Sequence, residues 1–310
     1  MIIQPMTYEL QGMAPLSHLG VIHAQGEDAV KFLQGQLTQD FALLAPNQAR
    51  LAAFCSAKGR MQASFVGFKR GEHDIVLVCS RDLLAATLKR LSMFVLRAKV
   101  KLTDASAAFE LYGLAGAAVA ALAGGPHPAW TKLDLDAAQL VTLYPAGAVP
   151  RALWLAPVGT PLPDVPPLGA DAWAWGEVQS GVATITVPIS DAFVPQMLNY
   201  ESVGGVSFKK GCYPGQEVVA RSQFRGTLKR RGYLVRADAP MAAGDEIFQA
   251  ADADQPCGTV AQAAQAADGS FAAIASLQVA AVEAGNLHLR GADGPAVSLL
   301  PLPYALMADI

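Results

Sequence analysis

The last third of the chain carries the pattern that most restricts its fold, a series of short β-like runs with no strong helix between them. Turn-forming residues separate these runs at short intervals, as in sheets built from successive hairpins. The runs cover residues 232–236, 245–250, 257–262, 270–277, 286–290 and 296–300. Six short strands in such a segment are typical of a small antiparallel barrel, so the sequence predicts a C-terminal β-barrel domain over residues 227–310.

Residues 1–226 show a different order, in which strands and helices alternate. The clearest helix is predicted over 81–94, because its leucines fall on one face. Further helices are predicted over 26–38, 116–123, 171–181 and 216–224, and strands over 20–24, 51–55, 61–68, 74–79, 95–102, 109–114 and 152–157. This order is typical of ferredoxin-like units, so we predict an α+β fold whose paired units, which can be two interleaved domains, precede the barrel.

Residues 208–231 form a basic stretch with seven cations and one acid, Glu217, in a chain whose formal net charge is −3. The cations are Lys209, Lys210, Arg221, Arg225, Lys229, Arg230 and Arg231. A Gly-Cys-Tyr-Pro-Gly turn places Cys212 just before the helix predicted over 216–224. Cations and helix N-termini stabilise the thiolate, which predicts a reactive thiol at Cys212. The alternative is that Cys212 is a small buried hydrophobe, as many free cysteines are.

The string GGVSFKKGCYPGQE at 204–217 resembles the signature of the folate-binding YgfZ family, whose core is K-G-C-Y-x-G-Q-E. The likeness extends to FLQGQLTQD at 32–40, AKGR at 57–60 and PLPY at 301–304, and so covers almost the whole chain. That family is similar in fold to the T protein (aminomethyltransferase) of the glycine cleavage system. It is associated with maintaining iron–sulfur enzymes, including one that thiomethylates tRNA.

The resemblance implies a fold like that of the T protein around a central cavity that binds tetrahydrofolate. It implies folate contacts from Trp173, Gln179 and Lys58, although a tryptophan is by itself more often a core residue. We expect the thiolate of Cys212 to be the key reactive group and to open onto this cavity. The motif residues expected to support it are Lys210, Gly211, Tyr213, Gly215, Gln216, Glu217 and Arg221. The basic stretch could bind the carboxylates of the folate tail.

Two functions of different classes stay open. The first is a folate-binding accessory protein that acts with iron–sulfur assembly proteins or their client enzymes. The second is a tetrahydrofolate-dependent one-carbon transferase. T-protein relatives carry an acidic pair after the first hairpin and a Glu before Ala-Gly, whereas this chain has no carboxylate in 59–63 and has Gln179 at the second position. An amide cannot act as a general base, which weighs against aminomethyl transfer.

Other chemistries find little support in the sequence. The five histidines show no metal-ligand spacing and the four cysteines form no C-x-x-C pair, so we predict no metal site. Direct tRNA contact through the basic stretch is a weaker hypothesis, because the overall charge is mildly negative. Sparse cysteines are typical of a reducing compartment, and we find no signal peptide or apolar span. We therefore expect a cytoplasmic protein without membrane contact.

Overall fold

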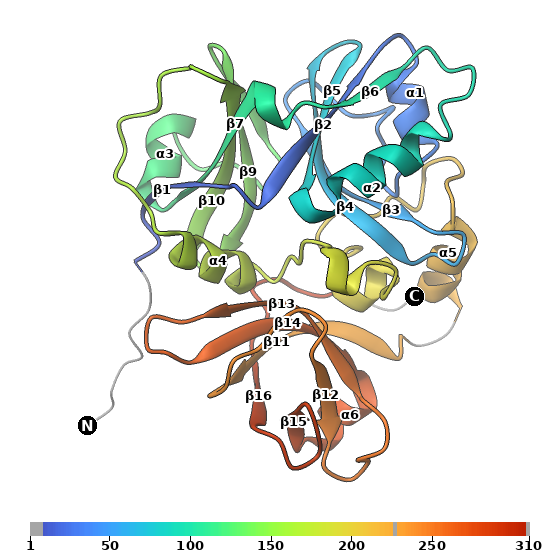
Figure 1. The fold of residues 1–310 in the computed structure, drawn as a ribbon, viewed down its shortest axis with the longest axis vertical. Coiled ribbons are helices and arrows are strands. Elements are labelled where there is room, and N and C mark those ends of the chain that lie inside the picture. The colour runs from blue at the N-terminus through green and yellow to red at the C-terminus, as the bar shows by residue number, and fades with distance from the viewer. Residues whose placement is uncertain (1–8, 226–227, 308–310) are drawn as a thin grey trace.

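The computed structural model describes residues 9–225 and 228–307, and Figure 1 shows two α+β bodies side by side above a small barrel. The first body is an antiparallel sheet of strand order β3-β4-β5-β2-β6, and buried side chains join it to two helices. The first strand in the sequence, β1, belongs to the sheet of the second body. The first body consists of β2 (Leu19–Gln25), α1 (Ala29–Gln34), β3 (Ala49–Cys55), β4 (Met61–Gly71), β5 (Asp74–Ser80), α2 (Arg81–Ser92) and β6 (Lys101–Asp104).

The second body is an antiparallel sheet of order β1-β7-β10-β9-β8. Since β1 precedes the whole first body and β7 follows it, the two bodies are interleaved in sequence. Val21 and Val76 of the first sheet share a buried cluster with Val141 and Leu153 of the second. The second body consists of β1 (Gly12–Pro15), η1 (Ser106–Ala108), β7 (Phe109–Ala115), α3 (Ala117–Ala123), β8 (Lys132–Leu135), β9 (Ala138–Ala146), β10 (Val149–Pro157) and α4 (Ala170–Gln179).

The C-terminal strands close into a barrel of order β11-β14-β13-β12-β15-β16, which confirms the prediction from the short runs. A six-residue helix, α6 (Val279–Ala284), interrupts them and was not predicted. The predicted boundary between 226 and 227 lies outside the described residues. The strands are β11 (Arg230–Ala237), β12 (Glu246–Gln249), β13 (Gly258–Gln265), β14 (Phe271–Gln278), β15 (Leu287–Leu289) and β16 (Ala296–Leu300).

An irregular segment at 181–206 connects the three bodies. It contains only two short 3-10 helices, η2 (Val187–Ile189) and η3 (Pro195–Leu198), yet many of its side chains are buried. The Asn199 side chain accepts a hydrogen bond from the Gly232 backbone N–H at 3.1 Å and donates one to the Gly232 carbonyl at 2.8 Å. The Asn199 side chain therefore satisfies both backbone polar groups of Gly232.

One predicted strand was wrong. Residues 95–100 form turns after α2, and only Lys101–Asp104 are a strand. Leu96 has a φ of 42°, in the left-handed region, which a strand cannot contain. Arg97 and Lys99 are exposed, as expected for that face. None of the helices found in residues 9–225 and 228–307 is long and apolar enough to cross a membrane.

Candidate functional site

Cys212 lies in a surface loop that we call the cysteine loop, residues 208–215. The loop leads into α5 (Gln216–Phe224), the helix that the sequence predicted. Cys212 is exposed, whereas the other three cysteines of the chain are buried. Burial raises the pKa of the Cys55 and Cys79 thiols to about 12. The alternative interpretation of Cys212 as a buried hydrophobe is therefore wrong.

The cysteine loop docks onto the turn between β3 and β4 through two glycines. A Cβ on Gly215 would lie 2.4 Å from the Ser56 carbonyl oxygen and 2.6 Å from the Gly59 Cα. Both glycines have positive φ, 79° and 70°, so neither position readily accepts another residue. Lys58 is exposed on this turn, and its role as a folate contact stays a prediction.

Lys210 anchors the loop from the other side. It is 7% exposed, and its Nζ donates hydrogen bonds to the carbonyls of Gln34 and Leu37 at the end of α1. Burial lowers the Lys210 pKa to about 8, although Asp40 and Cys212 oppose this shift. The amine also lies 4.7 Å from the centre of the buried Tyr213 ring.

The residues that follow α1 also bind the segment just before the cysteine loop, residues 205–207. Thr38 Oγ1 donates to the Gly205 carbonyl at 2.7 Å, and the Thr38 carbonyl accepts from the Ser207 N–H at 2.9 Å. The segments 32–40, 57–60 and 204–217, which are far apart in sequence, thus meet around Cys212. In Figure 1, α5 accordingly lies against the β3–β4 end of the first body.

The cations of the basic stretch fall into two groups. Lys210, Arg230 and Arg231 bind within the protein, the last through Glu201 at 3.1 Å. The others are exposed, and of these Arg221 pairs with Glu217 one turn away at 3.0 Å. The exposed cations are Lys209, Arg221, Arg225 and Lys229. Gly211 is also exposed, with open space around it, and Gln216 is half-buried in the first turn of α5.

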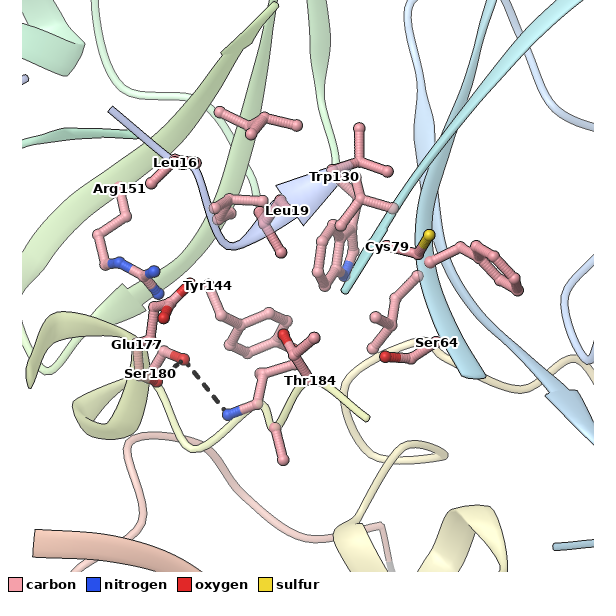
Figure 2. A pocket seen from close by; sticks show the side chains of 18 of the residues that line it. Leu16, Leu19, Ser64, Cys79, Trp130, Tyr144, Arg151, Glu177, Ser180 and Thr184 are labelled. Carbon is pink, nitrogen blue, oxygen red and sulfur yellow. Dashed lines mark hydrogen bonds between the residues drawn. The ribbon is translucent and has the colours of Figure 1, made fainter. Parts of the chain in front are cut away.

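A separate cavity lies between the two sheets and is closed by α4 and residues 180–184. About 650 Å³ of space free of protein atoms lies within and around it, a figure that includes open solvent at its mouth. Figure 2 shows Arg151 and Glu177 on one side and Trp130 on the other. The cavity is lined by Leu16, Leu19, Leu51, Ser64, Phe65, Val66, Val78, Cys79, Trp130, Leu143, Tyr144, Arg151, Leu153, Trp173, Glu177, Ser180, Val182, Ala183 and Thr184.

Aromatic rings form one wall of this cavity. Trp130 and Tyr144 have ring centres 5.9 Å apart, and Tyr144 in turn contacts Tyr304 of the C-terminal segment at 5.6 Å. The Trp130 indole N–H donates to the Val203 carbonyl at 2.9 Å, and its backbone has a left-handed φ of 68°. Such strained backbone at a non-glycine residue is frequent at binding sites. Sequence reasoning missed both Trp130 and Tyr144.

Trp173 does line the cavity, but it does not offer a free face to a ligand. A Cβ on Gly113 would lie 2.5–2.6 Å from three of its ring atoms, and the Arg151 guanidinium lies 4.3 Å from a Trp173 ring centre. The indole is therefore enclosed by Gly113 and Arg151 and is 2% exposed. Its Nε1 has no hydrogen-bond partner among the described residues. Gln179 is not among the residues that line the cavity, and its role as a folate contact stays a prediction.

Glu177, two residues earlier on α4, is the carboxylate that lines the cavity. Its Oε1 lies 3.3 Å from His18 Nε2, and its Oε2 accepts from Gln262 Nε2 at 3.3 Å. The side chain of Glu177 is 13% exposed. Cys212 is absent from the cavity lining, so the expectation that its sulfur opens onto the cavity was wrong. In residues 9–225 and 228–307 no three His, Cys, Asp or Glu side chains cluster as metal ligands would.

Comparison with known proteins identifies the family. Residues 6–140 match the family model described as the GCVT N-terminal domain. The chain is 32% identical over 298 residues to the tRNA-modifying protein YgfZ of Edwardsiella ictaluri, covering 92% of this chain and 89% of that protein. The chain belongs to the YgfZ family. The YgfZ relative from Sodalis glossinidius is also 32% identical, over 310 residues that cover 94% of this chain and 92% of the relative.

The fold agrees with the one expected from the resemblance to YgfZ. The glycine cleavage system aminomethyltransferase T of Bartonella henselae superposes with a TM-score of 0.67 over 94% of this chain and 86% of that one. The identity between the two is 19%, so the comparison shows a shared fold. This YgfZ family member therefore has the T-protein-like architecture of two α+β bodies and a barrel around a central cavity.

Proposed function

We propose that this YgfZ family member binds a tetrahydrofolate in the central cavity. We further propose that it acts as an accessory protein for iron–sulfur enzymes, with Cys212 as the reacting thiolate. The relatives' name, tRNA-modifying protein, supports an enzyme of tRNA thiomethylation as the client. The aminomethyltransferase fold supports folate as the ligand class.

The observation that carries the folate proposal is a cavity with the Glu177 carboxylate on one side and the Trp130 ring, in contact with Tyr144, on the other. A pterin is flat, and its N3–H and 2-amino groups form adjacent donors that match one carboxylate. Aromatic rings next to a single well-placed polar group are typical of small-molecule cavities. The residues present therefore fit a pterin, and when bound the folate would supply a one-carbon carrier.

Cys212 would act from outside this cavity. Its loop is held by glycine contacts to the β3–β4 turn and by Lys210, while its sulfur is exposed. An iron–sulfur assembly protein or a client enzyme could thus approach the thiol without entering the cavity. A cytoplasmic location belongs to the same proposal, because a thiolate of this kind is maintained in a reducing compartment.

Two substitutions separate the sites. Cys212→Ser should leave the tetrahydrofolate Kd, measured by tryptophan fluorescence, within about twofold of wild type. It should also abolish tRNA thiomethylation in cells that depend on the protein. Glu177→Gln should weaken binding by about 10-fold or more, since a hydrogen bond to a charged group is lost.

Asp171→Asn is the matched control for Glu177→Gln, because Asp171 is an exposed carboxylate on the same helix outside the cavity lining. It should bind tetrahydrofolate as wild type does. Full thiomethylation with Cys212→Ser would remove the role of the thiol. An unchanged Kd with Glu177→Gln would remove the cavity as the folate site.

A one-carbon transferase is the second candidate function. Glu177 favours it, since it supplies the carboxylate that residues 59–63 and Gln179 lack. Purified protein alone would then turn over a methylene- or methyl-folate, and Glu177→Gln would reduce that turnover. Absence of turnover under saturating folate, with binding intact, would favour the accessory role.

Direct tRNA contact would use the exposed cations of the basic stretch, namely Lys209, Arg221, Arg225 and Lys229. Cations that contact phosphates release counterions, so such binding weakens steeply with salt. A tRNA affinity that falls with salt in wild type and is lost on replacing these four residues by Ala would support contact. Equal affinity of the two proteins would exclude the basic stretch as the binding surface.

A further inference from the structure

Arg151 is a buried cation whose guanidinium has no hydrogen-bond partner among the described residues. It is 4% exposed and lines the central cavity. Its Nε has no hydrogen-bond partner, and no hydrogen bond or ion pair to its guanidinium occurs within residues 9–225 and 228–307. Burial lowers its pKa to about 10, so it is charged at neutral pH. The Glu177 carboxylate attracts this charge and opposes the lowering of its pKa, but no described group accepts a hydrogen bond from the guanidinium. Buried donors are costly without an acceptor, which indicates that a ligand supplies one.

The fold holds this guanidinium in one orientation. A register shift between Val149 and Arg151 bulges β10 at this point, and bulges re-aim side chains near binding sites. The guanidinium then stacks on Trp173, whose ring also packs against Gly113. Figure 2 shows Arg151 on the same side of the cavity as Glu177. A ligand in the cavity would therefore meet a fixed donor and a fixed acceptor side by side.

This pair restricts the chemistry of the ligand. A carboxylate only accepts hydrogen bonds, and a guanidinium only donates them. A ring that satisfies both needs adjacent donors on one edge and an acceptor next to them. A 4-oxopteridine has this arrangement, with N3–H and the 2-amino group as donors and O4 as the neighbouring acceptor.

We propose that Arg151 binds the 4-oxo group of the pteridine and makes the cavity selective for 4-oxopteridines over 4-aminopteridines. This inference rests on the proposed folate binding. In a 4-amino analogue the acceptor O4 is replaced by a donor that faces the donors of Arg151, and N3 loses the hydrogen that Glu177 would accept, so the contribution of Arg151 is read from the change in preference in the Arg151 variant. A site built to hydrogen-bond one group discriminates strongly against a group that leaves its buried polar atoms unpaired.

The test compares tetrahydrofolate with its 4-amino analogue by fluorescence titration. Wild type should bind the 4-amino compound about 10- to 100-fold more weakly, the value of a hydrogen bond to a charged group. Arg151→Met should weaken tetrahydrofolate binding by a similar factor and leave binding of the 4-amino compound nearly unchanged. The preference of Arg151→Met for tetrahydrofolate over the 4-amino compound should therefore be at least about 10-fold smaller than that of wild type. Equal binding of both compounds by wild type would overturn the inference without any variant.

Arg70→Met is the matched control. Arg70 also stacks on an aromatic ring, 4.8 Å from the Phe109 centre, but it is only half-buried and lies outside the cavity lining. It should keep the wild-type preference. If Arg151→Met fails to fold, Arg151→Lys keeps the charge, loses the planar fork, and should still reduce the preference.

The outcomes separate the two proposals. A wild type that binds neither compound contradicts the folate proposal itself. A wild type that binds tetrahydrofolate, with a folded Arg151→Met that keeps the full preference, contradicts only the role of Arg151.

Discussion

Gly215→Ala tests how the cysteine loop is held. The new Cβ would lie 2.4 Å from the Ser56 carbonyl oxygen and 2.6 and 2.7 Å from Gly59 Cα and N, all backbone atoms that cannot rotate away. Relieving such a clash costs about 1–3 kcal/mol. Alanine at a φ of 79° costs about 1–2 kcal/mol more. We therefore expect a loss of about 2–5 kcal/mol, or about 4–10 °C in melting temperature at about 2 °C per kcal/mol.

Gly211→Ala is the matched control in the same loop, because a Cβ there meets nothing within 4 Å. It should melt within about 1 °C of wild type. Thermal melts followed by circular dichroism measure both variants. If Gly215→Ala and Gly211→Ala melt together, the docking of the loop through Gly215 is refuted.

Four further predictions concern Lys210, the thiols and Tyr304. Lys210→Met should destabilise by about 1–3 kcal/mol, because two carbonyls lose their donor, whereas exposed Lys209→Met should cost under about 0.5 kcal/mol; equal melts would contradict this. Burial lowers the Lys210 pKa from 10.5 to about 8, so between pH 8 and pH 10.5 the lysine is neutral in the folded protein and protonated in the unfolded chain. Unfolding therefore takes up a proton in this range, and the stability of wild type relative to Lys210→Met should increase as the pH rises from 8 to 10.5. A disulfide reagent at pH 8 should label Cys212 quickly and the other thiols only after denaturation; fast labelling of all four would exclude their burial. Tyr304→Phe should cost about 1 kcal/mol through the lost 2.8 Å hydrogen bond to the Gly181 carbonyl, and an unchanged melt would show that this bond contributes nothing.

Elements with a strong local pattern were predictable from the sequence. The helix α5, the hairpin of β3 and β4 and all six barrel strands agree because turns and periodicity specify them locally. β9 (Ala138–Ala146) was missed for a physical reason. It is a central strand buried on both faces, so it does not alternate, and Pro145 near its end is typical of a loop.

The surroundings of Cys212 were partly predictable, since the motif strings at 32–40, 57–60 and 204–217 do meet there. The cavity was not, because side chains from distant elements form it and no short-range pattern joins them. One signal was present: Arg151 is the single charge in the apolar strand VPRALWLAP, and a charge within a buried strand indicates a site. The expectation that Cys212 opens onto the cavity failed because its loop docks onto the outer β3–β4 turn.

The most direct test of the account is a crystal structure with tetrahydrofolate. We predict the pteridine in the central cavity beside Trp130 and Tyr144, with its donors about 2.7–3.2 Å from the Glu177 carboxylate and Cys212 free of contact with it. A pteridine bound at the cysteine loop, or a cavity that stays empty at saturating ligand, would contradict the account.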